Sequence, residues 1–373
     1  KIEKCAFSDS SIETITIQSF LIEFDNKCFC NTKKLQKIII KTKCSNLQQY
    51  DESLFLGKSS PKNRSFNVIT FASKDVEKVK IPSSIEIIGQ ESFKNCENLN
   101  EITFSLLTKL QIIENYAFES SNIHFISVPS SLTRICIGAF YSCYNLYTIE
   151  FPKKSQLKVI EELAFAESSI CEIYFPIHLT LIDKKAFYGC NQLTKVEFPK
   201  NSELKIIEES AFSKSAIEKL NLPSHVSQIG KYAFGSCKYL QNIEIPEDSE
   251  LKIIEEGSFS GTGIKNITIP AHTTKLCQEA FKDCIMLSKI NLPNLAYIES
   301  GSFRNTNLMR IELNSVIEIN SKMFNGAFSK CSNLTHATMN TIQIVGANSF
   351  QSCSNLIYID MPNARNIYSG AFV

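Results

Sequence analysis

Phenylalanine recurs along this chain with a nearly constant period. Between Phe93 and Phe372 it occupies thirteen positions separated by steps of 22 or 25 residues. The positions are Phe93, Phe118, Phe140, Phe165, Phe187, Phe212, Phe234, Phe259, Phe281, Phe303, Phe328, Phe350 and Phe372. A fixed period of this size is the signature of stacked repeats, in which each unit covers the apolar face of the next. The period predicts one continuous core, although a length of 373 residues alone would suggest two or three domains.

A larger period of 47 residues joins the repeats in pairs. The segments Glu203–Pro223 and Glu250–Pro270 are identical at 11 of 21 positions. Up to Phe281 the phenylalanine steps alternate between 25 and 22 residues, which sum to 47. The array is therefore interpreted as the product of tandem duplication of a double repeat.

Each unit has the form AFxxCxxLxxIxIP followed by LxxIxxxAF. In the first part, apolar residues alternate and a proline ends the pattern, which predicts a short strand. The second part is rich in Ile and Val, and only about ten residues separate the first strand from the next repeat phenylalanine, which favours a second short strand or one helical turn over a full helix. The sequence predicts a leucine-rich repeat solenoid of the α/β repeat class, dominated by strands. We expect a curved right-handed superhelix with a parallel sheet of short strands on the binding face and short strands or helical turns elsewhere.

The pattern AFxxCxxLxxIxIPxSLxxIgxxAF resembles the BspA-like leucine-rich repeat family. The local match is well seen in Ile81–Phe93, which reads IPSSIEIIGQESF and is followed by KNCENLNEITF. The resemblance covers residues 76–372, with looser copies back to Cys5. Proteins of this family are typically surface or secreted proteins of mucosal bacteria and parasitic protists, and they are associated with adhesion to host proteins and cells.

The N-terminal part departs from the pattern. We expect a single solenoid over residues 1–373, with irregular repeats in 1–75, a loop insertion at 56–70 and regular repeats of 22–25 residues in 76–373. Leu47–Phe55 still fits LxxIxxxAF, but the Gly, Ser, Pro and Asn residues that follow predict a protruding loop. Either a tolerated insertion or a specific contact loop explains it.

Fourteen cysteines do not imply a disulfide framework here. Seven of them lie three residues after a repeat phenylalanine, and five of these seven are two rungs apart, about 10 Å, which is too far for a bridge. These seven, predicted to be small buried apolar residues beneath a turn, are Cys96, Cys143, Cys190, Cys237, Cys284, Cys331 and Cys353. A bridge among Cys5, Cys28, Cys30 and Cys44 remains open. No CxxC motif occurs, so zinc binding of ordinary spacing is not supported.

Other residues that could carry chemistry also follow the repeat. His178, His225 and His272 step by 47 residues, so neighbours lie about 10 Å apart along the stack, too far for one metal ion. They are interpreted as exposed turn residues. The glutamate pairs at 161–162, 208–209 and 255–256 are interpreted as structural for the same reason. No GxSxG, HExxH, P-loop or GxGxxG motif occurs, so we expect no enzyme, no metal and no cofactor.

Charge and hydropathy narrow the classes of partner. The net charge is +1, without the basic footprint of a nucleic-acid-binding protein. No apolar run reaches the length of about 18 residues that spans a membrane. No signal peptide is visible, but the chain begins without Met and ends inside a motif, so we expect that it is part of a longer protein. The sequons at Asn63, Asn266 and Asn333 permit glycosylation without implying secretion.

The outward positions of the strands form the expected binding surface. With the central Ile of each strand facing inward, the residues on either side of it face solvent. The candidate ligand-binding residues on this face are Phe125, Glu150, Glu172, Tyr174, Lys195, Glu197, Lys219 and Asn221. Phe125 and Tyr174 are candidate anchors, because large exposed aromatics often supply binding energy; the alternative is that they pack against neighbouring strand residues.

These features lead to two functional hypotheses. The first is a non-catalytic leucine-rich repeat protein, on the cell surface or secreted, that mediates protein–protein interaction in adhesion to host cells or extracellular-matrix proteins. The second is an intracellular, cytoplasmic scaffold that uses the same face for a protein partner. Neither needs a nucleic acid, a cofactor or a membrane span within this chain.

Overall fold

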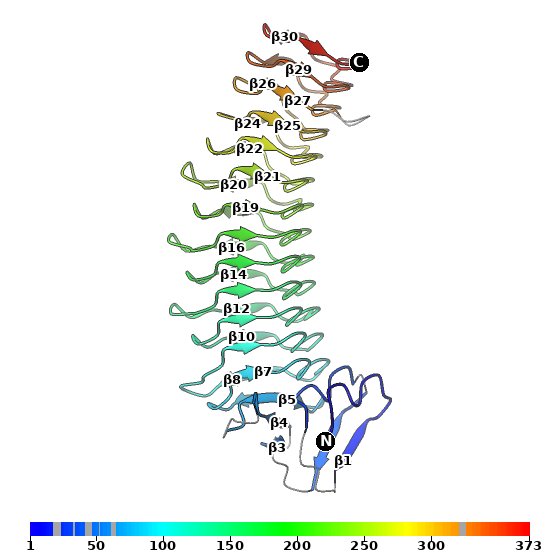
Figure 1. Ribbon diagram of the computed structural model, residues 1–373, viewed down its shortest axis with the longest axis vertical. Coiled ribbons are helices and arrows are strands. Elements are labelled where there is room, and N and C mark those ends of the chain that lie inside the picture. Colours follow the sequence, from blue (N-terminus) through cyan, green and yellow to red (C-terminus); the bar gives the residue numbers. More distant parts are fainter. Residues whose placement is uncertain (18–23, 33, 42–46, 52, 61–64, 321–325) are drawn as a thin grey trace. The chain divides into compact units, whose positions relative to one another are not determined.

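The structure, a computed structural model, describes residues 1–17, 24–32, 34–41, 47–51, 53–60, 65–320 and 326–373. These residues form two compact units, Lys1–Leu179 and Thr180–Val373, which we call unit 1 and unit 2. Every regular element in the described ranges is a β-strand. Figure 1 shows the strands as successive rungs within each unit, as expected for a strand-dominated repeat solenoid.

Unit 1 begins with an irregular cap. Strands β1 (Thr14–Ile17) and β2 (Lys37–Ile40) form a parallel pair. Strands β3 (Leu47–Gln49), β4 (Leu54–Gly57) and β5 (Val68–Ala72) form an antiparallel meander, and β5 then pairs in parallel with β7 of the first regular repeat. The ends of segment 56–70, where a loop was expected, thus belong to strands, whereas residues 61–64 lie outside the described residues.

Aromatic side chains hold the cap to the first repeat. The ring centroids of Phe29 and Phe71 lie 5.7 Å apart, and those of Phe55 and Phe71 lie 6.1 Å apart. All three rings are buried in one apolar cluster with Phe24 and Leu35. The cap therefore covers the end of the repeat stack in unit 1, a location where a solenoid would otherwise expose its core.

Each regular repeat contains two short strands. In unit 1 the first strands are β6 (Lys78–Ile81), β8 (Glu101–Phe104), β10 (Phe125–Ser127), β12 (Thr148–Glu150) and β14 (Glu172–Tyr174). The second strands are β7 (Ile87–Ile88), β9 (Ile112–Ile113), β11 (Arg134–Ile135) and β13 (Val159–Ile160). Parallel pairing joins β6 to β8 and, in a separate sheet, β10 to β12 and β12 to β14; the second strands β7, β9, β11 and β13 pair in one continuous run. The second apolar segment is thus a strand, which was one of the two forms expected for it.

Unit 2 repeats the same plan. Its first strands are β16 (Lys195–Glu197), β18 (Lys219–Asn221), β20 (Asn242–Glu244), β22 (Asn266–Thr268), β24 (Lys289–Asn291), β26 (Arg310–Glu312), β28 (His336–Thr338) and β30 (Tyr358–Asp360). Its second strands are β15 (Leu181–Ile182), β17 (Ile206–Ile207), β19 (Gln228–Ile229), β21 (Ile253–Ile254), β23 (Lys275–Leu276), β25 (Tyr297–Ile298), β27 (Glu318–Ile319), β29 (Ile344–Val345) and β31 (Asn366–Ile367).

The repeat phenylalanines form a stacked column inside each unit. In unit 1, Phe118 and Phe140 lie with ring centroids 5.0 Å apart and planes within 5°, and Phe140 and Phe165 are 5.1 Å apart. In unit 2 the same geometry holds from Phe187 to Phe372. The column confirms that these side chains are the core of the repeat.

A tight turn presents each of these rings to the core. The residues two before and two after Phe140, Gly138 and Ser142, have φ of 57° and 54°. Flanking residues of most other repeats share this left-handed conformation, whether or not they are glycine. The backbone N–H of Phe140 donates to the carbonyl of Ala164 in the next repeat at 2.7 Å. The turn thus satisfies its backbone groups by stacking, which offsets the cost of the unusual φ.

The cysteines after the phenylalanines are buried, as expected, but they also donate hydrogen bonds. The thiol of Cys143 donates to the carbonyl of Phe118 at 3.0 Å, and Cys237 does the same to Phe212 at 3.1 Å. At the same position of the intervening repeats stand Ser or Thr, such as Ser121, 3.7 Å from the sulfur of Cys143. The position therefore requires a small side chain with a donor, a need that the apolar interpretation missed.

Candidate functional site

The outward residues of the first strands form one exposed face in unit 1. Strands β10, β12 and β14 place Ile126, Ile149 and Ile173 in the core, at most 2 % exposed. The residues on either side of each point to solvent, because successive side chains of a strand face opposite ways. The inward and outward rows were therefore assigned correctly from the sequence.

The four predicted residues of unit 1 all lie on this face. Phe125 is 43 % exposed and Tyr174 is 46 % exposed. In the strand register, Phe125 is opposite Thr148, which in turn is opposite Glu172, and Glu150 is opposite Ser127. The two aromatics thus lie on alternate strands, about 10 Å apart across the sheet, with β12 between them.

Tyr174 is oriented by its own strand. Its hydroxyl donates to Oε2 of Glu172 at 2.9 Å. Because both residues lie on β14, this bond runs along the strand and keeps the carboxylate of Glu172 next to the Tyr174 hydroxyl. The pair therefore presents an aromatic surface and a negative charge together, a combination that suits a polar partner with an apolar or cationic group.

Three exposed aromatic residues that were not predicted lie next to these strands in the sequence. Tyr147 precedes β12 and is 41 % exposed; its ring centroid is 6.2 Å from that of the exposed His124, which precedes β10. Tyr144, in the turn before Tyr147, is 61 % exposed. Tyr147 and His124 occupy the same position of two neighbouring repeats, one residue before the first outward residue of the strand. The prediction covered only the two residues that flank each central Ile, so it missed them. We call Phe125, Tyr147, Tyr174, His124 and Tyr144 the aromatic face.

Unit 2 carries the other four predicted residues, and they form a different surface. Lys195, Glu197, Lys219 and Asn221 are all exposed. Lys195 and Glu197 form an ion pair along one strand at 3.0 Å, and Lys219 lies 3.8 Å from Glu244 on the next strand. These exposed pairs are largely solvated and contribute little binding energy by themselves. The predicted residues of unit 2 thus make a charged surface without an aromatic anchor.

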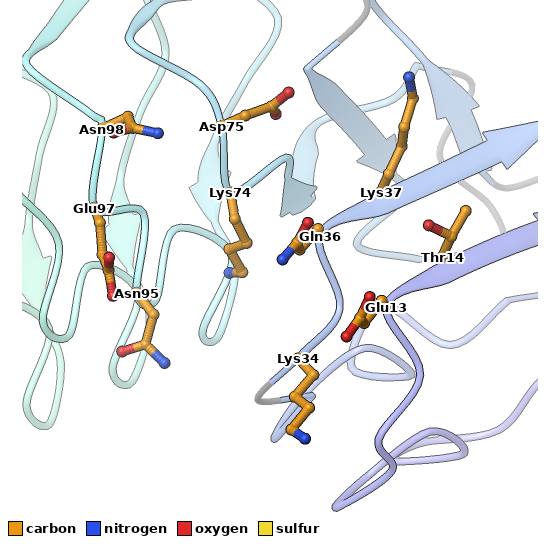
Figure 2. A pocket seen from close by; sticks show the side chains of 10 residues that line it. All are labelled: Glu13, Thr14, Lys34, Gln36, Lys37, Lys74, Asp75, Asn95, Glu97 and Asn98. Atoms are coloured by element: carbon orange, nitrogen blue, oxygen red, sulfur yellow. The ribbon is translucent and has the colours of Figure 1, made fainter.

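A polar cleft lies between the cap and the first repeat of unit 1. It has a volume of about 650 Å³ and is lined by Glu13, Thr14, Lys34, Gln36, Lys37, Lys74, Asp75, Asn95, Glu97 and Asn98. Figure 2 shows Asn95 and Glu97 on the repeat side, Lys34 and Glu13 on the cap side, and Lys74 between them. Most of these side chains are exposed and none is aromatic. The cleft therefore offers solvated charges of both signs rather than a shaped apolar pocket.

Lys74 is the one unusual group in this cleft. Its ammonium donates to the carbonyl of Lys94 and lies 5.3 Å from the ring centroid of Phe71. Burial lowers the pKa of Lys74 below the ordinary value for lysine. Its hydrogen bond and ring contact tie Phe71 of the cap cluster to the turn at Lys94, so its role is structural.

Several glutamates and cysteines of the repeats have structural roles, as hydrogen-bond acceptors or as buried side chains. The carboxylate of Glu161 accepts from the N–H of Ile137 at 3.1 Å and from Nε of Arg134 at 2.8 Å. Glu114 accepts from Gln90 N–H at 2.9 Å in the same way. Burial raises the pKa of the Cys143 thiol to about 12, so this thiol is a poor nucleophile.

The cysteines, histidines and sequon residues are described only in part. Among the described residues, each cysteine is a free thiol, including Cys5, Cys28 and Cys30; Cys44 and the sequon residue Asn63 lie outside them. His225 and His272 are exposed, as expected for turn residues, whereas His178 is half-buried. Within the described ranges, no three His, Cys, Asp or Glu side chains gather as a metal site, and no helix is long and apolar enough to span a bilayer.

Comparison with known proteins identifies the family. The family described as "BspA type Leucine rich repeat region (6 copies)" matches residues 1–69, 64–187, 158–286 and 252–373. The matches together cover the whole sequence, so the chain belongs to the BspA-type leucine-rich repeat family. Leucine-rich repeat proteins of this kind typically bind protein partners and are typically non-catalytic.

Two solved structures share the fold. A leucine-rich repeat protein from Bacteroides ovatus is 23 % identical with a TM-score of 0.62, and the match covers 87 % of this chain and 92 % of that chain. The pneumococcal vaccine antigen PcpA is 21 % identical with a TM-score of 0.52, over 88 % of this chain and 90 % of that chain. A search of curated protein sequences gives no significant match.

Proposed function

We propose that the chain is a non-catalytic surface or secreted protein that binds a protein ligand through the aromatic face of unit 1, in adhesion to host cells or extracellular-matrix proteins. The observation that carries this proposal is the group of large aromatic side chains held in solvent by β10, β12 and β14. Phe125 and Tyr174 are 43 % and 46 % exposed on strands whose other outward positions are polar, and Tyr147, just before β12, is 41 % exposed.

The physical case rests on where binding energy arises. Aromatic residues are enriched among the few positions that dominate protein interfaces, and polar neighbours around them exclude water and fix specificity. Glu150 and Glu172 supply such a polar surround here. Tyr174 is already restrained by its hydrogen bond to Glu172, so less conformational entropy is lost when a partner binds.

The surface location is supported by two findings. The chain belongs to a family whose members are associated with adhesion. It also shares its fold with a protein described as a pneumococcal vaccine antigen. The proposed partner is a protein of the host surface or matrix.

Binding assays on the aromatic face test this function. The double variant Phe125→Ser with Tyr174→Ser should bind immobilised matrix proteins or host cells at least about tenfold more weakly, because two anchors are lost. Its melting temperature and circular dichroism should stay close to those of the unaltered protein, since both side chains are exposed. Tyr297→Ser is the matched control, because it removes a Tyr that is 47 % exposed from strand β25 of unit 2. Equal losses in the variant and the control would show that the aromatic face is not the binding surface.

A further inference from the structure

Two adjacent leucines in unit 1 project into solvent at the tip of a turn. Leu106 is 93 % exposed and Leu107 is 92 % exposed. They follow β8 in a turn closed by a hydrogen bond from Thr108 N–H to the Ser105 carbonyl at 3.2 Å. Leu107 has φ of 62°, a left-handed conformation that residues with a Cβ adopt only at a cost in conformational energy. Neither burial nor backbone preference explains leucine at these two positions.

The duplicated repeats supply an internal comparison. At steps of 47 residues, the positions of Leu106 and Leu107 are occupied by Lys153 and Lys154, by Lys200 and Asn201, and by Glu247 and Asp248. None of these six polar residues has a positive φ. The repeat therefore accepts solvated residues at this tip in a relaxed conformation, and the pair of leucines is specific to the first copy.

Basic residues surround the leucines on the neighbouring turns. The turns at 105–109, 129–131 and 152–156 stack in order, because Ser131 Oγ donates to the Thr108 carbonyl at 3.3 Å and Gln156 N–H donates to the Ser130 carbonyl at 2.9 Å. Lys109, Lys153 and Lys154 are exposed on them. These three turns and the preceding turn at 82–84 contain no Asp or Glu. We call the four turns the basic turn edge.

The chemistry of this edge fits a lipid surface better than a protein pocket. Protein interfaces are enriched in Trp, Tyr and Arg, whereas lysine is depleted there and leucine is uncommon among dominant contacts. A bilayer interface, in contrast, accepts aliphatic side chains at the acyl boundary and attracts lysine to anionic headgroups. Two leucines beside three lysines on one edge supply these two kinds of contact.

We propose that the basic turn edge docks on an anionic membrane surface, with Leu106 and Leu107 entering the interfacial region and Lys109, Lys153 and Lys154 facing the headgroups. The contact is peripheral and reversible, because two leucines and three lysines anchor far less strongly than a membrane-spanning segment. It uses turns rather than the strand face, so it does not depend on the protein ligand proposed above.

Vesicle flotation with the full chain tests the proposal. The protein should float with phosphatidylcholine vesicles that contain phosphatidylserine, and should bind pure phosphatidylcholine much less. The variant Leu106→Ser with Leu107→Ser should bind at least about tenfold more weakly, and so should Lys153→Glu with Lys154→Glu. The matched control alters the same tip in unit 2, Glu247→Ser with Asp248→Ser, and should not weaken binding. Failure to bind the anionic vesicles, or binding that survives loss of the leucines, would overturn the proposal.

The absence of tryptophan from the chain allows a second, direct measurement. In Leu106→Trp the only indole reports on the turn tip, so its emission should shift to shorter wavelength on addition of anionic vesicles and should be quenched by brominated lipid. Tyr297→Trp places the indole on β25 and should show neither change. An unshifted Leu106→Trp spectrum in the presence of bound vesicles would show that another surface makes the contact and would reject this edge.

Discussion

Phe140 and Phe125 have the same side chain and opposite surroundings. Phe140 stacks between Phe118 and Phe165 and is 0 % exposed, whereas Phe125 on β10 is 43 % exposed. The difference arises from position within the repeat: one lies in the turn that points into the core, and the other lies on an outward position of a strand. A residue's place in the repeat thus determines whether its side chain is buried in the core or exposed on the surface.

Alanine substitution should separate these two roles. Phe140→Ala should reduce the free energy of unfolding by about 3–5 kcal/mol, because it removes one ring of the column and leaves a cavity. Phe125→Ala should reduce it by less than about 1 kcal/mol, since much of that ring is already in water. Urea denaturation of both variants measures the difference. Similar losses for the two would contradict the assignment of Phe140 to the core.

The buried thiols should make stability depend on alkaline pH. Burial raises the pKa of Cys143 from an ordinary value of 9.0 to about 12. Above pH 9 the thiol of the unfolded chain loses its proton while that of the folded chain keeps it, so the unfolded state binds fewer protons and stability falls as pH rises toward 12. The expected loss from this thiol at pH 10 is on the order of 1 kcal/mol.

Cys143→Ser is the variant that isolates this effect. Serine keeps a donor for the Phe118 carbonyl but does not titrate in this range. Urea denaturation at pH 8 and pH 10 should therefore show a smaller loss of stability for Cys143→Ser than for the unaltered chain. Other groups titrate equally in both proteins, so parallel losses would show that this thiol is not shielded from solvent in the folded state.

At the scale of the element, the phenylalanine turn couples each repeat to the next. Gly257 has φ of 58°, and a Cβ placed there would lie 2.1 Å from the ring of Tyr232 in the preceding repeat. Gly301 has φ of 67°, but a Cβ there would meet only Cγ of Glu279, at 3.3 Å. Both glycines therefore adopt a left-handed backbone conformation, but only Gly257 lacks room for a Cβ atom.

This difference predicts unequal costs for the same substitution. Gly301→Ala should lose about 1–2 kcal/mol of stability from the left-handed conformation alone. Gly257→Ala should lose about 1–3 kcal/mol more, because the methyl group overlaps the Tyr232 ring. Thermal and urea denaturation of both variants measure the loss of stability. Repeating Gly257→Ala in a Tyr232→Ala background separates the cost of the left-handed backbone from the cost of overlap with the Tyr232 ring. The prediction fails if removing the ring does not reduce the extra cost of Gly257→Ala.

The strands and the column were predictable from the sequence because they depend on local periodicity. The alternation around Ile149 identified β12 and its outward residues, and the spacing of Phe identified the core ring of each repeat. The antiparallel meander β3–β5 was not predicted, since Leu47–Phe55 fits the repeat pattern while its pairing depends on contacts with the cap. The left-handed residues around each Phe were also missed, because many are not glycine and their φ is imposed by hydrogen bonds to the next repeat.

The candidate site was predictable only in part. Exposure of Phe125 and Tyr174 follows from strand alternation, but the contact of His124 with Tyr147 depends on how two pre-strand residues align across neighbouring repeats. The turn with Leu106 and Leu107 was also not predictable from the sequence alone. The exposure of both side chains and the φ of Leu107 are properties of the folded turn.

For the whole molecule, the repeat plan makes stability a sum of contacts between neighbours. In the regular repeats of unit 1, stacked rings and strand ladders join one repeat to the next. Damage at one rung should therefore act locally before it acts globally. The expectation of a single cooperative solenoid over residues 1–373 becomes testable through the range over which such damage spreads.

Hydrogen exchange followed by mass spectrometry measures that range. Phe140→Ala should reduce amide protection most in the repeats that hold Phe118 and Phe165, with a smaller change in unit 2. Phe328→Ala, which removes a ring 5.0 Å from Phe303 and 5.1 Å from Phe350, is the matched variant in unit 2 and should reduce protection most near those residues. The reason is that the backbone bonds of each turn are made to the adjacent repeat, so a cavity frees first the amides stacked on it. An equal loss of protection along the entire chain in both variants would instead show all-or-none unfolding, in which every repeat depends on every other.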